Sequence, residues 1–589
     1  MTPPRLVPTL PWTADARLAI PGSKSSANRL LVAAALSGRA LTLHGVPAAD
    51  DVVHMVHGLR AFGFALRFEP ARERIDFEPA GPARLAAAGP VEIFCGNAGT
   101  TLRFLTSLAA VTPGEWTLTG DAAMRQRPIG ALVTALRQLG ADVRDTNGCP
   151  PVRVRTTTVP AGGRVELDAS QSSQFLSSLL LVGAALRAGI DVHVTGPLAS
   201  RDYVTLTCRE LARLHVRTET TDHGVRVLPG FGKGPAELDV DGDWSSLGVW
   251  TCLNHLTGSR IAATNPPPPD AQPDAVLAGV LRALPEHGEH TIDVGAFPDQ
   301  FCNLAVVAAC RSGTTRFTGG ANLRIKESDR IAVMARELRK IGADAQELAD
   351  GLVVRGGRAL HAAIVDPERD HRIAIALALA GLLTPGIAIG EPDCVAKSYP
   401  RFWQHLAQVV AHPRCVAVVG MRGAGKSTFA RALARTAGLV VHDTDTRFVA
   451  EHGAIAPFVA SHGWSAFRTH EERFVAEALL PGTVVSTGGG AIESAAGRAL
   501  LRERAFVVWL TAPAALLRAR LAADAGQRPS ITGAPVLDEI EPLLARREPL
   551  YAEAAHLRID AALPVEQQVA AALRGLRQHG RWPGSAAPA

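Results

Sequence analysis

Lysine is scarce in this chain: six lysines stand beside 55 arginines in 589 residues. Arginine is a planar fork that keeps its proton, whereas lysine is a compact charge whose pKa shifts readily. A lysine retained in so arginine-rich a chain is therefore a candidate for chemistry that arginine cannot perform. Chance could explain one such residue, but four of the six lie in polar motifs, which indicates function: Lys24, Lys326, Lys397 and Lys426.

Other absences exclude several classes of protein. The eight cysteines form no Cys-x-x-Cys pair, which argues against a zinc site or a disulfide framework and favours a reducing compartment. No uncharged apolar run is long enough to cross a membrane, and the N-terminus lacks the layout of a secretion signal. The net charge is only +5, and no basic stripe carries interleaved aromatic residues, which argues against nucleic-acid binding. We therefore expect a cytoplasmic protein with small-molecule partners and neither nucleic-acid nor membrane partners.

A helix-ending phrase, Leu followed by Arg and apolar residues, recurs in the first 400 residues. Its copies lie at 59–63, 136–140, 211–215, 281–285 and 338–342, and three of the five end in glycine. Glycine just past a helix is the usual left-handed cap, so each copy predicts a helix, a cap and a strand. The recurrence predicts repeated α/β units, unless the phrase is merely common in helices rich in Leu and Arg.

The character of the sequence changes near residue 411. Ala-His-Pro at 411–413 breaks a helix, and the apolar run at 415–419 predicts a buried strand. Strand-like and helix-like segments then alternate, with further strands expected at 483–486 and 505–510. We predict one region over 1–411, a small parallel α/β domain over 412–577, and a flexible tail over 578–589.

A phosphate-binding loop follows the strand at 415–419. Residues 420–427 fit Gly-x-x-x-x-Gly-Lys-Ser and open a helix. Glycines there let backbone N–H groups wrap around phosphate oxygens at a helix N-terminus. Lys426 would bridge the β- and γ-phosphates, and the Ser427 hydroxyl would ligate Mg²⁺. A glycine-rich turn without function is the less favoured alternative.

Two carboxylates, Asp443 and Asp445, close what we interpret as the second strand of this domain. Residues two apart on a strand share a face. One carboxylate could then serve a metal ion while the other accepts a proton from a substrate hydroxyl.

Further motifs follow in a set order: Phe-Arg-Thr-His-Glu at 467–471, Ser-Thr-Gly-Gly-Gly-Ala at 486–491, Arg-Pro at 528–529 and Arg-Glu-Pro-Leu-Tyr at 547–551. Together with the phosphate-binding loop they resemble shikimate kinase over 412–577. The resemblance implies a P-loop kinase fold with a parallel sheet flanked by helices. This chain departs from the family's usual residues at Trp464 and at Ser530. These departures affect the expected behaviour of the lid more than the expected chemistry.

The same resemblance implies roles for individual residues. Asp443 and Ser427 would hold Mg²⁺, Asp445 would be the base, and Arg528 would reach the transferring phosphate from the lid. The residues expected around ATP are Gly423, Ala424, Gly425, Lys426, Ser427, Thr428 and Arg528. The residues expected around shikimate are Asp445, Arg468, Gly489, Gly490 and Arg547.

Polar motifs are also spread over the first 411 residues, at 22–29, 97–103, 125–130, 172–176, 200–203, 298–299, 322–330, 370–372 and 396–398. Widely spaced cations beside Gly or Ser predict two anionic ligands held between lobes. In this order the motifs resemble EPSP synthase (3-phosphoshikimate 1-carboxyvinyltransferase). Asn-Ala-Gly-Thr at 97–100 and Lys-Glu-Ser-Asp-Arg at 326–330 are the most specific. The resemblance implies two lobes, about 20–240 and about 241–411 with the N-terminal segment, each built from three similar α/β units.

This second resemblance also assigns roles. Shikimate 3-phosphate would be bound by Lys24, Ser25, Arg29, Ser172, Ser173, Gln174, Ser200, Tyr203, Asp299, Asn322 and Lys326. Phosphoenolpyruvate would be bound by Lys24, Asn97, Gly99, Arg127, Gln174, Arg330, Arg372 and Lys397. Asp299 would be the base for the 5-hydroxyl, Glu327 the proton donor to the CH₂ group, and Lys24 the stabiliser of the leaving phosphate. A ring of cations can stabilise such charge without a metal or other cofactor.

The product of the predicted kinase is the substrate of the predicted transferase. We therefore predict a bifunctional enzyme that uses shikimate, ATP, shikimate 3-phosphate and phosphoenolpyruvate, with Mg²⁺ in the kinase domain. Two alternatives stay open. The first region could act on a UDP-amino-sugar, as sister enolpyruvyl transferases do, or the second could bind shikimate and ATP without turnover.

Overall fold

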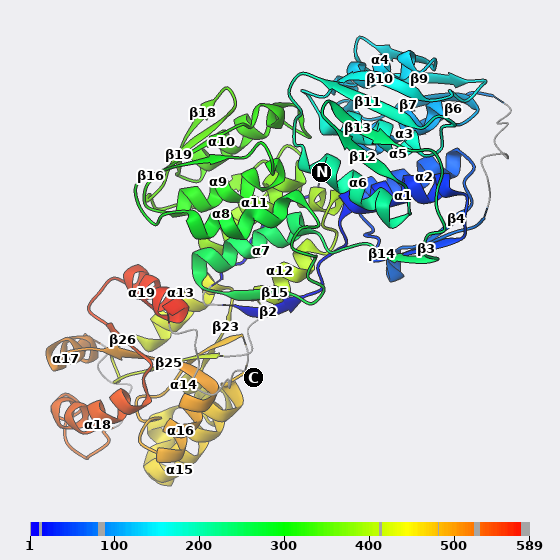
Figure 1. The fold of residues 1–589 in the computed structure, drawn as a ribbon. Coiled ribbons are helices and arrows are strands. Elements are labelled where there is room, and N and C mark those ends of the chain that lie inside the picture. Colours follow the sequence, from blue (N-terminus) through cyan, green and yellow to red (C-terminus); the bar gives the residue numbers. More distant parts are fainter. Residues whose placement is uncertain are drawn as a thin grey trace. The chain divides into compact units, whose positions relative to one another are not determined.

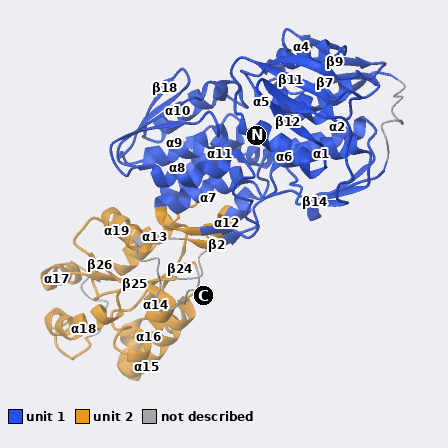
Figure 2. Ribbon diagram, viewed as in Figure 1, with its two compact units in different colours: residues 1–7, 17–256, 261–405 blue, residues 8–16, 257–260, 406–589 orange. Residues whose placement is uncertain are grey.

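The computed structural model describes residues 2–10, 14–79, 89–410, 415–480, 482–523 and 530–578. The chain forms two compact units (Figure 2), one of residues 1–7, 17–256 and 261–405 and one of residues 8–16, 257–260 and 406–589. The predicted boundary at 411/412 and the tail beyond Gln578 lie outside the described residues. No helix in the described ranges is long and apolar enough to cross a membrane.

Four sheets of the first unit repeat one topology. In each, two strands run parallel, and an antiparallel hairpin completes the sheet. In spatial order, the strands of the first sheet are β14 (Glu237–Asp239), β3 (Leu41–His44), β5 (Arg74–Phe77) and β4 (Leu66–Glu69), and those of the second are β6 (Val91–Phe94), β7 (Gly114–Thr119), β9 (Cys149–Thr156) and β8 (Asp142–Thr146). The strands of the third sheet are β10 (Gly163–Asp168), β11 (Ile190–Thr195), β13 (Gly224–Val227) and β12 (Thr218–Thr221). Those of the fourth are β16 (Glu289–Asp293), β17 (Thr314–Thr318), β19 (Gly351–Arg355) and β18 (Asp344–Leu348).

The described residues also form two smaller sheets. Their strands are β1 (Arg5–Leu6), β21 (Ile387–Ile389) and β20 (Ala363–Val365), and β15 (Arg260–Ala263) with β2 (Asp15–Leu18). The repeated α/β units confirm the predicted fold class for this region (Figure 1).

The helix-ending phrase marks the caps as expected. Gly63, Gly140 and Gly342 have φ of 84°, 89° and 98°, and each lies between a helix and a strand. Two copies lack glycine. In the one at 211–215, His215 itself adopts the left-handed conformation, with φ of 58°. The copy at 281–285 differs, because Leu284 is extended.

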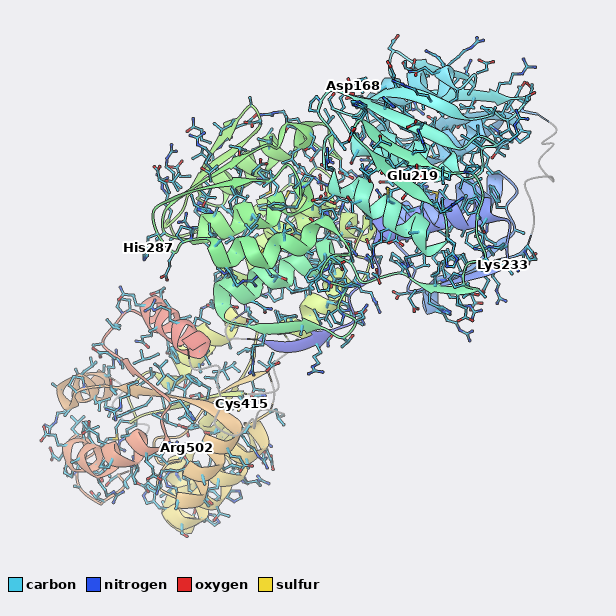
Figure 3. The ribbon with its side chains drawn as sticks, viewed as in Figure 1. Asp168, Glu219, Lys233, His287, Cys415 and Arg502 are labelled. Atoms are coloured by element: carbon cyan, nitrogen blue, oxygen red, sulfur yellow. The ribbon has the colours of Figure 1, made fainter. Side chains whose placement is uncertain are left out.

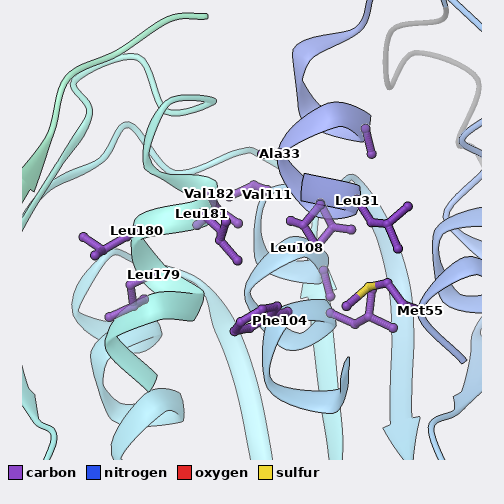
Figure 4. Packing of buried hydrophobic residues seen from close by; sticks show 14 of the residues in the cluster. Leu31, Ala33, Met55, Phe104, Leu108, Val111, Leu179, Leu180, Leu181 and Val182 are labelled. Carbon is purple, nitrogen blue, oxygen red and sulfur yellow. The ribbon is translucent and has the colours of Figure 1, made fainter. Parts of the chain in front are cut away.

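Six helices form the interior of this unit: α1 (Lys24–Ser37), α3 (Gly99–Ala110), α5 (Ser173–Gly183), α7 (Trp244–Thr257), α9 (Phe301–Cys310) and α11 (His371–Leu383). Most of their residues are buried, and apolar residues predominate among the buried ones. Leu31 of α1, Phe104 and Leu108 of α3 and Leu179 of α5 belong to one continuous core (Figure 4). Outer helices are α2 (Asp50–Ala61), α4 (Gly130–Gln138), α6 (Asp202–Arg213), α8 (Leu277–Ala283), α10 (Arg330–Lys340) and α12 (Phe402–Val410).

The second unit contains a parallel sheet. Its strands, in spatial order, are β23 (Val440–Asp443), β24 (Thr483–Ser486), β22 (Cys415–Val419), β25 (Ala505–Thr511) and β26 (Leu557–Asp560). Its helices are α13 (Lys426–Ala437), α14 (Thr444–His452), α15 (Ile455–Ala478), α16 (Ala495–Arg504), α17 (Ala514–Ala523), α18 (Ile540–Ala554) and α19 (Val565–Gln578). Central strands β22 and β25 are uninterrupted apolar runs because helices cover both faces of such sheets.

One local assignment was wrong. The second strand ends at Asp443, and Asp445 lies in the first turn of α14. The Asp443 carboxylate accepts a hydrogen bond from the Thr446 N–H at 3.1 Å, so it caps the helix. The two carboxylates therefore do not share a strand face.

Two candidate active sites

The lysines divide by environment as their motifs suggest. Lys397 and Lys426 are buried, and Lys24 and Lys326 are partly buried. The two lysines outside the motifs, Lys233 and Lys340, are exposed, and Lys233 is visible in Figure 3. The two exposed lysines are thus distinct from the four lysines of the motifs, all of which are at least partly buried.

A pocket in the first unit brings most of the predicted transferase residues together. Those that line it are Lys24, Ser25, Arg29, Gly99, Arg127, Ser172, Ser173, Gln174, Ser200, Tyr203, Asp299, Asn322, Lys326, Glu327 and Arg330. The other three border it through contacts with lining residues: Lys397, Asn97 and Arg372.

Helix N-termini converge on this pocket. Lys24, Gly99, Ser173 and His371 are the first residues of α1, α3, α5 and α11, and all four line it. A helix N-terminus carries partial positive charge and free N–H groups. The buried helices therefore add to the lysines and arginines in favouring anions here.

Asp51 joins two of the lysines. Its carboxylate lies 2.9 Å from Lys24 Nζ and 3.1 Å from Lys397 Nζ, and its side chain is 4% exposed. Burial raises the pKa of Asp51, but Lys24 and Lys397 outweigh burial and lower it. Lys397 also donates to the Asn97 carbonyl at 2.5 Å. Sequence reasoning missed Asp51, because nothing in its local pattern marks it.

Asp299 lies between two arginines and a tyrosine. Its Oδ1 is 3.0 Å from Arg330 Nη1, and its Oδ2 is 3.1 Å from Arg372 Nη2 and accepts from the Tyr203 hydroxyl at 3.2 Å. Burial favours the protonated acid, but Arg372 and Arg330 hold the pKa of Asp299 far below its usual range. The carboxylate is therefore ionised, as a base must be.

Glu327 is held by cations as well. Its Oε2 is 2.8 Å from Arg330 Nη2, and its Oε1 is 3.9 Å from Lys397 Nζ. Burial raises the pKa of Glu327, but Arg330, Arg127 and Lys397 together keep it well below the usual range. An anion that engaged these cations would weaken their hold and raise that pKa.

Asn322 and Lys326 lie on the short segment that precedes α10. Asn322 Nδ2 donates to the Ser200 hydroxyl at 3.3 Å, and that hydroxyl donates to the Gly295 carbonyl at 3.1 Å. Burial lowers the pKa of Lys326 to about 8, although Asp299 opposes the shift. Lys326 is therefore a cation whose charge changes within an accessible pH range.

The guanidinium of Arg127 packs closely against Gly99, in a position that a side chain on residue 99 would obstruct. A Cβ added there would lie 2.9 Å from three atoms of the Arg127 guanidinium. Arg127 also donates to Asn97 Oδ1 at 3.3 Å.

Arg29 lines the pocket, but its donors are directed to protein atoms, including Thr207 Oγ1 at 2.8 Å and the Ser25 carbonyl at 2.8 Å. A phosphate contact by Arg29 stays a prediction.

Gln174 and His371 complete the polar lining. Gln174 Nε2 donates to Thr100 Oγ1 at 3.1 Å, while its Oε1 accepts from Arg103 at 2.5 Å. His371 is 1% exposed, and burial with Lys24 and Arg372 nearby keeps its pKa well below the usual value. A neutral imidazole is therefore present at this edge of the pocket.

The phosphate-binding loop of the second unit has the expected form. Gly425 has φ of 90° and precedes α13, so the loop turns directly into the helix N-terminus. Lys426 Nζ donates to the Met421 carbonyl at 3.1 Å. The Ser427 hydroxyl donates to Asp443 Oδ2 at 2.5 Å and lies 3.3 Å from the Ser486 hydroxyl. The predicted Gly423, Ala424 and Thr428 belong to this loop and to the first turn of α13.

A second pocket in this unit contains the predicted shikimate residues. Asp445, Arg468, Gly489, Gly490 and Arg547 line it, with Arg422, Trp464 and Glu471 among the others. The predicted lid residue Arg528 lies outside the described residues. A Cβ on Gly490 would come within 2.1 Å of the Arg468 guanidinium, so glycine is required for that arginine's position.

Carboxylates pair with the arginines of this pocket, and sequence reasoning assigned them no role. Arg468 pairs with Glu471, which is 3% exposed. Burial raises the pKa of Glu471 despite Arg468. Arg422 donates to Glu539 at 2.6 Å, and Glu539 also accepts from the N–H of Ile531 at 2.9 Å. The signal that could have found them is the need of a buried guanidinium for a partner, which is often a carboxylate.

The fold and both pockets define an enzyme that transfers groups between small anions. A family model of EPSP synthase (3-phosphoshikimate 1-carboxyvinyltransferase) matches residues 11–406, and one of shikimate kinase matches residues 422–576. The chain belongs to the EPSP synthase family and carries a shikimate kinase domain as well, which makes it a bifunctional enzyme of the shikimate pathway.

Relatives agree with the first match. A 3-phosphoshikimate 1-carboxyvinyltransferase of Methanoculleus marisnigri is 38% identical over 416 residues, which cover 67% of this chain and 96% of the relative. One of Shewanella halifaxensis is 34% identical over 404 residues, which cover 65% of this chain and 94% of the relative. The solved EPSP synthase of Acinetobacter baumannii is 24% identical, with a TM-score of 0.56 over 69% of this chain and 97% of that one, and supports the fold.

Proposed function

We propose that the two units catalyse consecutive steps. In the first, the 3-hydroxyl of shikimate attacks the γ-phosphate of ATP, giving shikimate 3-phosphate and ADP. In the second, the 5-hydroxyl of that product adds to C2 of phosphoenolpyruvate while a proton adds to its CH₂ group. Phosphate then leaves as the methyl group that has formed loses a proton, which restores the C=CH₂ group and gives the enolpyruvyl product. We place the boundary between the two domains at 411/412.

The observation that carries the transferase proposal is the meeting of separate lysines and helix N-termini at one pocket. Lys24, Lys326 and Gly99 come from distant parts of the sequence, yet all line it. Two anionic substrates supply the charge that such a pocket favours. We assign shikimate 3-phosphate and phosphoenolpyruvate to the residues named for each above.

Two carboxylates handle the protons in this scheme, and Glu327 must first take up a proton from solvent before it can donate one. Asp299 would accept the proton of the 5-hydroxyl. Glu327 would donate to the CH₂ group, after phosphoenolpyruvate engages the cations that hold its pKa low. Lys24 would stabilise the charge on the departing phosphate, as preorganised cations do where charge develops.

In the kinase domain, Arg468 and Arg547 would bind the carboxylate of shikimate, and Asp445 would bind its hydroxyls and act as the base. The Ser427 hydroxyl and the Asp443 carboxylate are adjacent, at 2.5 Å, and are the oxygen ligands that Mg²⁺ prefers. Mg²⁺ would neutralise charge on the nucleotide phosphates. We also propose a cytoplasmic location, which the eight free cysteines support.

One experiment tests both steps. The purified chain receives shikimate, ATP, Mg²⁺ and phosphoenolpyruvate, while ADP and phosphate are measured separately. We expect ADP first and phosphate only when phosphoenolpyruvate is present. Shikimate binding without ADP would instead indicate a non-catalytic C-terminal domain, and phosphate release with a UDP-amino-sugar but not with shikimate 3-phosphate would overturn the transferase assignment.

A further inference from the structure

Glu493 contacts two of the arginines that line the second pocket, Arg468 and Arg547, although no motif includes it. It lies in the turn between Gly490 and α16, and its N–H donates to the Gly490 carbonyl at 2.9 Å. The turn therefore places this side chain beside the pocket rather than inside it, and Glu493 is not among the residues that line the pocket.

The contacts with Arg547 involve one edge of its guanidinium. Glu493 Oε1 accepts from Arg547 Nε at 2.8 Å and lies 2.7 Å from Arg547 Nη2. Arg547 Nη1 is the guanidinium nitrogen nearest Gly489, where an added Cβ would lie 3.7 Å from it. Arg547 is 1% exposed, so its orientation is set by these contacts. Glu493 thus holds one edge of the guanidinium and leaves Nη1 on the pocket side.

The same carboxylate reaches a second arginine of the pocket. Glu493 Oε2 lies 4.0 Å from Arg468 Nε, and Arg546 donates to Oε1 at 2.6 Å. Burial raises the pKa of Glu493, but Arg547 and Arg468 outweigh burial and lower it. One ionised group therefore lies behind two of the cations that line the pocket, Arg468 and Arg547.

We propose that Glu493 is a positioning residue that sets the orientation of the Arg547 guanidinium, and its spacing from Arg468, for binding a substrate carboxylate. This inference rests on the proposed function of the kinase domain. The alternative is that Glu493 competes with the substrate for these arginines. The two roles predict opposite effects on affinity.

The test compares Glu493→Ala and Glu493→Gln with the wild-type full-length chain. We measure the Kd of shikimate, the Kd of its uncharged methyl ester, and the KM values of shikimate and ATP. For Glu493→Ala we expect shikimate to bind roughly tenfold more weakly, since charge-assisted pairs depend on geometry. We expect kcat, the KM of ATP and the Kd of the ester to stay unchanged. Glu493→Gln keeps the accepting oxygen and should restore part of the affinity.

A matched control is Glu553→Ala, which removes another glutamate–arginine pair that involves α18, with Arg498 Nε at 3.0 Å. It should leave shikimate binding unchanged. Tighter binding of shikimate by Glu493→Ala would establish competition and overturn the proposal, as would equal changes for the acid and the ester. If the wild-type chain neither binds nor phosphorylates shikimate, the proposed function itself fails, which is a separate result.

Discussion

Asp51 is a sensitive point of the transferase pocket, because one carboxylate serves as counter-charge to two lysines. We choose Asp51→Asn, which keeps the size of the side chain and removes its charge. Lys24 and Lys397 would then face each other with no carboxylate between them. Their side chains are 12% and 8% exposed, so water screens the repulsion only in part.

The magnitude follows from the burial of the pair. Removing one partner of a buried ion pair costs about 3–5 kcal/mol. If about 2–4 kcal/mol of this falls on the placement of Lys24 against the leaving phosphate, kcat/KM for shikimate 3-phosphate drops roughly 30- to 1,000-fold. We also expect a lower melting temperature for the transferase unit.

The assay is phosphate release from shikimate 3-phosphate and phosphoenolpyruvate, with ADP formation by the same chain as an internal reference. Asp50→Asn is the matched control, because Asp50 is the neighbouring residue, is exposed, and should tolerate the change. Full phosphate release and an unchanged melting temperature in Asp51→Asn would refute the reasoning, since both lysines would then need no counter-charge.

Three further predictions follow from the pKa shifts. Lys326 has a pKa of about 8, so kcat/KM for shikimate 3-phosphate should fall above pH 8 as this cation is lost, and Lys326→Arg should flatten the fall in the pH profile. Phosphoenolpyruvate should raise the pKa of Glu327, so binding measured by calorimetry in different buffers should show proton uptake that Glu327→Gln abolishes. Hydrogen bonds from Ser530 and Thr532 outweigh burial and lower the pKa of Glu539 to about 2. The ionised Glu539 therefore stabilises the fold above about pH 4.5, and this stabilisation is lost as the pH falls toward 2. The difference in melting temperature between the wild-type chain and Glu539→Ala should accordingly become smaller over that range.

The elements of the fold could be predicted where local chemistry decides them. Glycine caps at Gly63, Gly140 and Gly342 mark helix ends, and the apolar run of β22 identifies a buried parallel strand. The assignment of Asp445 to a strand failed because Asp443 is a good helix cap as well as a strand end. His215 shows the converse, since a residue other than glycine adopts the cap conformation.

The cations of the candidate sites stand in motifs, as do two of their counter-charges, Asp299 and Glu327, but other counter-charges do not. Lys24, Lys326 and Lys426 stand in motifs whose composition implies anion binding. Asp51 and Glu493 stand in no such motif, and their importance arises only from distances that the fold creates. Partner carboxylates of buried cations are set by tertiary contacts, which local sequence does not encode.

The central claim is that one chain holds two independent anion sites, each dependent on its own scarce lysine. The most direct measurement follows ADP and phosphate in parallel for Lys426→Met and Lys24→Met, with shikimate 3-phosphate supplied separately to the transferase. We predict that Lys426→Met loses ADP formation and keeps phosphate release, and that Lys24→Met does the reverse. Loss of both activities in either folded variant, or of neither, would contradict the account.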